Sequence, residues 1–262
     1  MEFSDQLHRK IFISKTPCRI VSLVPSQTEL LVELGLEASI VGVTKFCVHP
    51  EHLRKEKNIV GGTKQVKVDR IRDLNPDIIL CNKEENTKEM VTELEAIAPA
   101  WVSDIKGIED CLNMIQCFGE LFSVEIRANK LVSKIKTEHN LFVDAVKHIP
   151  ELKVAYLIWK DPYMAAGNDT FINTLLALNK FQNIFTDKDE RYPEVSVEQL
   201  KAADIILLSS EPYPFRQKHI DELFQALGNK KILLVDGEYF SWYGSRLQYA
   251  FEYFKSLQKT IH

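Results

Sequence analysis

Residues 123–148 contain no glycine or proline, and this stretch limits more than any other feature what the chain can fold into. Apolar residues recur along it at roughly helical spacing, at Val124, Leu131, Ile135, Leu141 and Val146. The pattern predicts one helix of about 25 residues, about 40 Å long at 1.5 Å per residue. Pro150 ends it, and because the stretch is not rich in glycine or serine, we expect a strut rather than a flexible linker.

Short apolar runs alternate with helical patterns on both sides of this stretch. Before it, the pattern predicts strands over 19–24, 39–43, 77–81 and 100–102, and helices over 26–34, 86–98 and 107–121. After it, strands are predicted over 153–159, 204–209 and 231–235, and helices over 169–178, 215–227 and 242–257. Such alternation is typical of parallel sheets covered by helices. The predicted fold class is therefore α/β, with two Rossmann-like lobes that have parallel sheets and are joined by one long backbone helix. The predicted domains are an N-terminal lobe 1–122, the linking helix 123–149 and a C-terminal lobe 150–262.

The first predicted helix has recognisable start and stop signals. Ser26 is a plausible N-cap, and Glu29 follows three residues later, at the spacing of a capping box. Gly35 is the predicted stop signal.

Composition excludes several classes of protein. The chain carries 33 Lys and Arg against 37 Asp and Glu, a net charge of −4, without basic blocks, which argues against nucleic-acid binding. No run of about 18 apolar residues exists, so no membrane span is predicted. The five cysteines, an odd number, include no C-x-x-C pair, and the first ten residues are polar. These features predict a soluble chain of a reducing compartment without an export leader, although a chain with its leader removed would look the same.

Standard catalytic and nucleotide-binding signatures are missing from the sequence. The nearest group of metal-ligand residue types is His49-Pro50-Glu51-His52, which could place two imidazoles near one metal or could be a solvated loop. Gly61-Gly62 either allows close approach of the backbone to a ligand or forms a plain turn. No catalytic cofactor and no enzymatic activity are predicted from these residues.

Aromatic residues gather in the second half of the chain. All eight tyrosines lie between Tyr156 and Tyr253. Several aromatic residues follow the predicted strands, where open α/β sheets bind ligands, and could form a flat apolar wall; the alternative is that they anchor loops to the core. These residues are Trp159, Tyr163, Tyr213, Phe215, Tyr239, Phe240, Trp242 and Tyr243.

The two halves of the chain also echo one another. Leu74–Leu80 resembles Leu200–Leu207, and an acid follows each strand at the same offset: Glu84 comes seven residues after Asp77, and Glu211 seven after Asp204. The echo either marks equivalent lobes or reflects the common composition of buried strands and loops.

Several segments together resemble a known family. The segment RIVSLVPSQTELL (19–31) is similar to the opening of class III, helical-backbone ABC-transporter solute-binding proteins, which bind cobalamin, haem, siderophores or metal chelates. The similarity continues through IVGVT (40–44), VGG (60–62), Ile71 and LNPDII (74–79), and resumes at Ala166-Gly167, NIF (183–185) and VSVEQL (195–200).

This resemblance implies two α/β lobes joined by one long helix, with a metal chelate such as cobalamin held in a cleft between them. It also implies a periplasmic location and a glutamate on each lobe that docks onto arginines of the permease. The docking candidates are Glu84, its neighbours Glu85 and Glu89, and Glu211. The candidates for cargo binding are Pro25, Ser26, Phe46, His49, Trp159, Tyr163, Tyr213, Tyr239 and Trp242.

The sequence departs from this family pattern in two places. Cobalamin-binding relatives use aromatic residues in loops of the N-terminal lobe, whereas His49 stands here beside Phe46, and Cys81-Asn82 follows the third strand. His49 could coordinate a metal centre axially, since imidazole is a good transition-metal ligand, or could be a spectator. The polar N-terminus is the second departure.

Three hypotheses remain open. The first is a monomeric solute-binding protein of an ABC importer, with cobalamin or another corrinoid, haem or a ferric siderophore as its cargo. The second is a cytoplasmic corrinoid or metal carrier, sensor or maturation factor that kept the fold. The third is an enzyme that would use His49, Glu211, Asp236 and Glu238.

Overall fold

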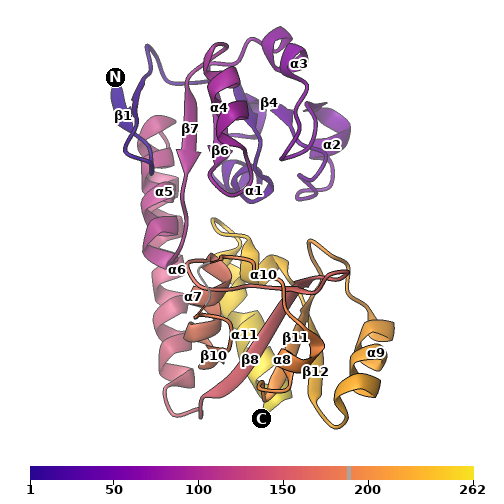
Figure 1. The fold of residues 1–262 in the computed structure, drawn as a ribbon. Helices are drawn as coiled ribbons and strands as arrows, with labels where there is room; N and C mark the ends of the chain where they lie inside the picture. The colour runs from indigo at the N-terminus through magenta and orange to yellow at the C-terminus, as the bar shows by residue number, and fades with distance from the viewer. Residues whose placement is uncertain (188–189) are drawn as a thin grey trace. The chain divides into compact units, whose positions relative to one another are not determined.

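A computed structural model describes residues 1–187 and 190–262. The chain folds into two compact units (Figure 1). Unit 1 comprises Met1–Ile105, Glu109–Ile135 and Tyr243–Gln248, and unit 2 comprises Lys106–Ile108, Lys136–Trp242 and Tyr249–His262. Each unit therefore combines segments from distant parts of the sequence. The predicted domain boundaries at 122/123 and 149/150 stay a prediction.

Unit 1 is built on a parallel sheet with the strand order β5-β4-β3-β6-β7. The strands are β3 (Ile20–Ser22), β4 (Ile40–Val43), β5 (Asn58–Ile59), β6 (Ile78–Asn82) and β7 (Ala100–Ser103). Every residue of β3, β6 and β7 is buried, as expected of parallel strands covered on both faces. The predicted strands are confirmed, and β5 is an additional short edge strand.

The helices of unit 1 follow these strands. They are α1 (Pro25–Glu33), the 3₁₀ helix η1 (Glu37–Ser39), α2 (Leu53–Glu56), α3 (Val68–Asp73), α4 (Lys88–Glu95) and α5 (Ile108–Leu121). The predicted cap of α1 is wrong: Val24 is the N-cap residue and Pro25 begins the helix. Proline fits the first helical turn because its missing N–H group would have no partner there. Ser26 therefore lies inside the helix, where it is buried.

An N-terminal hairpin, which the sequence analysis did not predict, also belongs to unit 1. Strands β1 (Glu2–Ser4) and β2 (Lys10–Phe12) pair antiparallel. The buried Asp5 carboxylate ends the first strand: it accepts hydrogen bonds from the N–H groups of Leu7, Arg9 and Val102 and forms an ion pair of 2.7 Å with Arg9. Asp5 thereby ties the hairpin to the edge strand β7.

Unit 2 repeats the parallel arrangement with the order β10-β8-β11-β12. The strands are β8 (Leu152–Trp159), β10 (Phe181–Asn183), β11 (Ile205–Ser209) and β12 (Lys231–Val235), and the short β9 (Met164–Ala165) pairs antiparallel with β8. Its helices are α7 (Phe171–Leu178), α8 (Val197–Leu200), α9 (Gln217–Leu227), α10 (Glu238–Ser241) and α11 (Leu247–Ile261). In Figure 1, α9 lies beside the edge strand β12.

The predicted closing helix 242–257 is wrong at its start, since α11 begins only at Leu247. Trp242 ends the short helix α10, and Gly244 follows with a φ of +97°. Glycine adopts this left-handed conformation without a steric penalty, whereas a helix cannot continue through it. The break separates α10 from α11, and the residues between them, from Tyr243 on, belong to unit 1.

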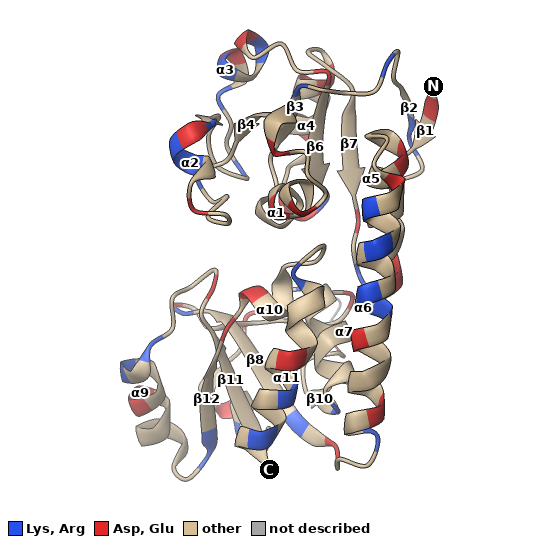
Figure 2. Ribbon diagram, turned by 180° about the vertical axis from the view of Figure 1, so that it is seen from behind, with Lys and Arg blue, Asp and Glu red and all other residues tan. Residues whose placement is uncertain are grey.

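The predicted long helix is confirmed as α6 (Glu125–Val146, 22 residues), which begins in unit 1 and ends in unit 2. Leu131, Ile135 and Val146 are buried as the periodicity predicts, whereas Leu141 is exposed and its neighbour Phe142 is buried instead. Charges of both signs follow one another along the helix (Figure 2). This mixture is typical of the solvated face of an amphipathic helix.

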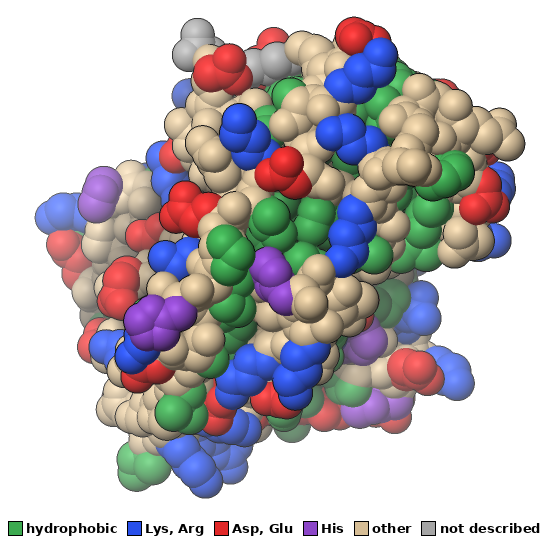
Figure 3. Space-filling model, turned by 90° about the horizontal axis from the view of Figure 1, so that it is seen from below, with side chains coloured by type: hydrophobic (Ala, Val, Ile, Leu, Met, Phe, Trp, Pro, Cys, Tyr) green, Lys and Arg blue, Asp and Glu red, His purple; other side chains and the backbone are tan. Residues whose placement is uncertain are grey.

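Among the described residues, no helix combines the length and the apolar character that crossing a membrane requires. All five cysteines are free thiols, and Cys47, Cys81 and Cys111 are buried. Burial raises the pKa of the Cys81 and Cys111 thiols to about 12, so both behave as packing residues. On the face of the molecule in Figure 3, basic and acidic side chains are interspersed.

Candidate functional site

The strand order places a switch point in each sheet. In unit 1 the chain runs from β3 outward to β4 and β5, and then returns to β6 on the other side of β3. In unit 2 it runs from β8 to β10 and returns to β11 on the other side of β8. Open α/β sheets bind ligands at the carboxyl ends of strands where the order reverses. The loops after β3, β6, β8 and β11 are therefore the candidate ligand loops.

The switch point of unit 1 has a polar floor of buried side chains. Gln27 in α1 donates from Nε2 to Ser103 Oγ (2.6 Å). The hydroxyl of Tyr243 hydrogen-bonds to Ser103, Gln27 and Ser26, and burial raises the pKa of this phenol well above its usual value. The segment 243–248 thus completes the end of a sheet to which it is remote in sequence. Pro25 and Ser26, both predicted as binding residues, are buried in the first turn of α1, and Ser26 is the one that bonds to Tyr243.

The loop after β4 adds an exposed aromatic ring. Phe46 is 47% exposed, and the ammonium of Lys45 lies 4.9 Å from its ring centroid. The neighbouring Cys47 points inward, with its Sγ 3.2 Å from the Thr28 hydroxyl and 3.3 Å from that of Thr44. Phe46 thus offers an apolar face to a ligand, whereas Cys47 holds the loop to the sheet.

His49 is half-buried in the same loop. Among the described residues, one group of three side chains has its ligand atoms close enough for a metal ion, and it comprises Glu37, His52 and Glu56. In this group the imidazole Nε2 of His52 lies 2.7 Å from Glu37 Oε1. His49 is not part of this group, so its role as a metal ligand stays a prediction.

The loops after β5 and β6 meet at a carboxylate. Glu85 is half-buried, and it accepts a hydrogen bond from the side chain of Thr63. Burial raises the pKa of the Glu85 carboxyl, and the nearby ammonium of Lys64 acts in the opposite direction. Asn86 Nδ2 donates to the Thr63 carbonyl (2.8 Å) and fastens the two loops together.

The other two acids predicted to dock in unit 1 differ in exposure. Glu84 is half-buried, and its carbonyl accepts a hydrogen bond from Lys64. Glu89 is exposed in the first turn of α4. It lines an open groove of about 520 Å³ together with Lys64, Lys67 and Glu93. Glu89 is thus the most accessible of the three acids.

The switch point of unit 2 carries an aromatic group at the end of β8. Trp159 is 41% exposed, and its ring centroid lies 5.6 Å from that of Tyr213, edge to face. Tyr213 is held in turn by His219, with its hydroxyl 3.3 Å from Nε2. Tyr163 packs against the same core, and burial raises the pKa of its phenol. Three of the predicted binding residues (Trp159, Tyr163 and Tyr213) therefore come together.

The remaining predicted residues of unit 2 lie around α10. Glu211 accepts a hydrogen bond from the Ser241 hydroxyl. Tyr239 stacks on Tyr253, with ring centroids 4.6 Å apart and planes at 17°. Trp242 is only 7% exposed. The place of these residues in a binding site stays a prediction.

The enzyme hypothesis also names Asp236 and Glu238, and Asp236 stabilises a turn of the backbone. Its Oδ1 accepts a hydrogen bond from the N–H of Glu238 (3.1 Å), and its own N–H donates to the Tyr253 hydroxyl (2.8 Å). These contacts shape the turn into α10, as short acidic side chains commonly do.

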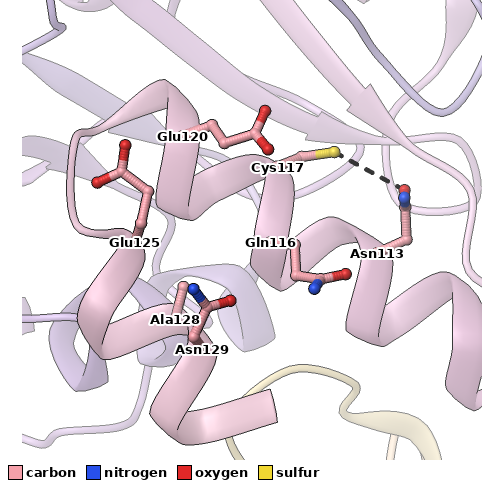
Figure 4. Close-up of a pocket in the computed structure, with 7 residues that line it drawn as sticks. All are labelled: Asn113, Gln116, Cys117, Glu120, Glu125, Ala128 and Asn129. Carbon is pink, nitrogen blue, oxygen red and sulfur yellow. Dashed lines mark hydrogen bonds between the residues drawn. The ribbon is translucent and has the colours of Figure 1, made fainter.

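A separate cavity of about 210 Å³ lies between α5 and α6 in unit 1. Figure 4 shows that Asn113, Gln116, Cys117 and Glu120 reach it from α5, and that Glu125, Ala128 and Asn129 reach it from α6. Burial, followed by the charge of Glu120, raises the pKa of the Cys117 thiol. None of the cavity's lining residues belongs to the strand-end loops.

The sequence analysis missed residues that only the fold brings to the switch points. The aromatic pattern indicates Tyr243 as a possible wall residue but gives no sign of its contacts in unit 1, and no local signal distinguishes Gln27 within its helix. Thr63 follows the glycine pair Gly61-Gly62, and this pair was the one local signal at that loop. Gly61 has a φ of +133°, and a Cβ there would lie 2.6 Å from the Gln65 carbonyl oxygen.

With this geometry in place, comparison with known proteins defines the class. The chain matches the model of the Periplasmic binding protein family over residues 20–234, and it belongs to this family.

Two curated relatives are binding proteins by name. The uncharacterized ABC transporter substrate-binding lipoprotein YvrC of Bacillus subtilis (strain 168) is 28% identical over 192 residues, which cover 70% of this chain and 60% of that protein. The vitamin B12-binding protein of Yersinia pestis (strain Pestoides F) is 25% identical over 183 residues, covering 70% and 65%. The chain thus spans less than two thirds of the length of these relatives.

A solved structure shares the fold over nearly the whole chain. It is a possible iron-binding (periplasmic solute-binding) protein from Staphylococcus epidermidis ATCC 12228, with a TM-score of 0.78 and 25% identity. The comparison covers 95% of this chain and 100% of that one. The α/β fold with two parallel sheets is therefore that of a solute-binding protein.

Proposed function

We propose that this protein is the solute-binding component of an ABC importer and that its cargo is a metal chelate: a corrinoid such as cobalamin, haem or a ferric siderophore. The observation that carries this proposal is the pair of exposed aromatic rings at carboxyl ends of strands, Phe46 after β4 in unit 1 and Trp159, which packs on Tyr213, at the end of β8 in unit 2. Flat apolar rings suit the faces of a macrocycle or an aromatic chelate. Vitamin B12 and iron in the names of the relatives support this class of cargo.

The protein acts by binding, not by catalysis. Asp236, one of the acids that an enzyme would use, bonds to the backbone of its own turn, and the Ser241 hydroxyl holds Glu211. We therefore assign no catalytic cofactor, and the metal arrives as part of the cargo. His49 remains the proposed axial ligand of that metal.

Titration of the purified chain with cyanocobalamin, haemin and a ferric siderophore tests the proposal. Binding of one of them should quench the tryptophan fluorescence, because Trp159 would lie against a coloured cargo. The variants F46A and W159A should each weaken binding about tenfold or more, as expected for the loss of a buried aromatic contact. F224A is a matched control, since Phe224 is 49% exposed on α9. Absence of binding of all three chelates at micromolar concentration would refute the cargo class.

Docking onto a permease requires exposed acids at equivalent places in the two units. Glu84, Glu85, Glu89 and Glu211 remain candidates, but Glu84, Glu85 and Glu211 are not fully exposed. A second pair fits the requirement better. Asp69 in α3 precedes β6, and Glu198 in α8 precedes β11, and their side chains are 93% and 78% exposed.

Charge reversal separates the two docking assignments. We expect D69K and E198K to abolish stimulation of the permease ATPase in proteoliposomes and to leave cargo affinity unchanged, since both side chains lie on the surface. E89K and E211K serve as the competing set. Loss of stimulation only in that competing set would refute the Asp69–Glu198 pair.

We further propose that the protein works outside the cytoplasmic membrane, as the family name implies. Fractionation of the native cell tests this location. Recovery of the protein only from the cytoplasm would favour the alternative role of a corrinoid or metal carrier inside the cell.

A further inference from the structure

We propose that Glu37, His52 and Glu56 bind one divalent ion of a first-row transition metal, such as Zn²⁺. The three side chains lie in unit 1, and each offers one ligand atom within 4.8 Å of the others. The inference goes beyond the proposed function, because this ion would belong to the protein itself, whereas the metal of the cargo arrives and leaves with its chelate. The site therefore does not depend on which cargo the protein carries.

The parallel sheet explains why these residues meet. Strands β4 and β5 are parallel neighbours. Glu37 begins the 3₁₀ helix η1, which ends directly before β4, while His52 is the N-cap residue and Glu56 the last residue of α2, which precedes β5. Because parallel neighbours begin at the same edge of a sheet, the three residues gather at the amino ends of β4 and β5. The candidate ligand loops lie at the opposite, carboxyl ends of the strands.

Local contacts hold the backbone of the site in place. The Lys57 ammonium donates to the Glu37 carbonyl (2.8 Å) and fastens the end of α2 to η1. Leu53, the first residue of α2, is completely buried. The Glu56 N–H donates to the His52 carbonyl (3.2 Å), and side chains four residues apart in a helix lie on the same face. Two ligands therefore come from one face of α2, and the third comes from η1.

The distances suit a metal ion with short bonds. His52 Nε2 lies 2.7 Å from Glu37 Oε1, and no two of the three ligand atoms are more than 4.8 Å apart. A tetrahedral Zn²⁺ ion with bonds of about 2.0–2.2 Å keeps its ligand atoms about 3.3–3.6 Å apart. The side chains of Glu37 and His52 are 37% and 45% exposed, so they have room to move to this separation.

The donor set selects the class of ion. An imidazole nitrogen with two carboxylate oxygens suits Zn²⁺ and its first-row neighbours, whereas Ca²⁺ and Mg²⁺ prefer oxygen ligands alone. Water would complete the four-coordinate shell, as it does in zinc sites with three protein ligands. The two carboxylates also match the charge of a divalent ion.

Basic residues of the same segment oppose the ion only weakly. Lys57 already uses its ammonium on the Glu37 carbonyl. Arg54 and Lys55 of α2 are exposed, and exposed charges are screened by water and salt. Arg54 follows His52 by two residues, which places it on another face of the helix. Direct coordination by two carboxylates therefore outweighs this repulsion.

An ion at this position would restrain the loop between β4 and α2. Residues 44–52 form this loop, and they carry Phe46 and His49. Glu37 lies before β4, whereas His52 ends the loop. Bonds from both residues to the same ion would fix the end of the loop and reduce the motion of the Phe46 ring.

Zinc titration by calorimetry tests the site. The full chain, without a purification tag, is treated with EDTA, dialysed and titrated with zinc chloride. Circular dichroism verifies that each variant is folded, and hydrogen exchange with and without zinc reports on residues 44–52. The ligand variants are E37Q, H52A and E56Q, and H49A tests the neighbouring histidine. E51Q and H148A are matched controls, because Glu51 and His148 are exposed residues of the same types outside the group.

We expect the wild-type chain to bind one Zn²⁺ ion with a micromolar dissociation constant. Each ligand variant should weaken binding about tenfold or more, since even a residue that only supports a metal ligand contributes about ten- to hundredfold. The two controls should leave the affinity unchanged. Zinc should slow amide exchange over residues 44–52 in the wild-type chain but not in H52A.

The inference fails if zinc does not bind saturably, or if E37Q and H52A leave binding unchanged. Binding that is lost in H49A and kept in E37Q would assign the ion to the pair His49 and His52 instead. Zinc binding without slower exchange would refute the restraint of the loop. Each of these results leaves the proposed function standing, because that function is tested by titration with cargo.

Discussion

Gly119 is the position where one methyl group should have the clearest effect on stability. It lies in α5, and a Cβ built there would be 2.7 Å from the Cβ of Ala128 in α6 and 3.3 Å from the Cα of Glu125. Carbon atoms pack at about 3.5–4.0 Å, so G119A brings two methyl groups about 1 Å too close. The glycine therefore sets how closely the two helices pack.

The magnitude follows from two opposing effects. Overpacking of this kind costs about 1–3 kcal/mol, and replacing a helical glycine by alanine gains about 1 kcal/mol. We expect G119A to lower the free energy of unfolding by up to about 2 kcal/mol. A128G should cost about 2 kcal/mol, from a lost buried methyl and a new helical glycine. In the double variant the clash is gone, so it should be at least as stable as A128G alone.

Urea unfolding measures these differences. Trp101 is a suitable reporter of unit 1, because it is buried and lies 5.8 Å from Phe118 of α5. A W159F/W242F background leaves it as the only tryptophan. A G119A variant more stable than its parent, or additive effects in the double variant, would refute the packing argument.

Three further predictions concern single side chains. Y243F should lower the free energy of unfolding by about 1–3 kcal/mol, measured by urea unfolding. The reason is that the buried side chains of Ser103, Gln27 and Ser26 lose the Tyr243 hydroxyl as a hydrogen-bond partner. Hydrogen bonds from Lys106 and Arg191 lower the pKa of Asp169, so its contribution to stability should be present above the ordinary aspartate pKa and lost as the pH falls. D169N should therefore remove part of the acid-side loss of stability in a pH series of thermal melts, and a series unchanged by D169N would contradict this. W159F should reduce the fluorescence quenching by cargo, and undiminished quenching would assign it to another tryptophan.

The pattern of the sequence was sufficient for the main elements of the fold. The α6 helix could be predicted because apolar residues recur at helical spacing over 26 residues that contain no glycine or proline. The central strands could be predicted because buried parallel strands are continuous apolar runs, as in Ile78–Asn82 and Ile205–Ser209. The hairpin of β1 and β2 escaped prediction because its strands have only three residues and its anchor is the Asp5 carboxylate.

The candidate site was predictable only where its residues follow strands in the sequence. Trp159 and Tyr213 could be found because each follows a recognisable apolar run. The contacts of Glu85 with Thr63 and of Gln27 with Tyr243 depend on which strands are neighbours and on a late return of the chain. Spacing along one sequence carries no information on such contacts.

The return of residues 243–248 to unit 1 has a consequence for synthesis of the protein. Arg246 forms an ion pair with Glu29 of α1 through two nitrogen–oxygen contacts of 3.0 and 2.8 Å, and Tyr243 completes the polar floor beside it. These partners leave the ribosome only after almost all of unit 2. The first unit therefore stays incomplete during translation, and a fragment cut within α6 would expose its unfinished sheet end to chaperones and proteases.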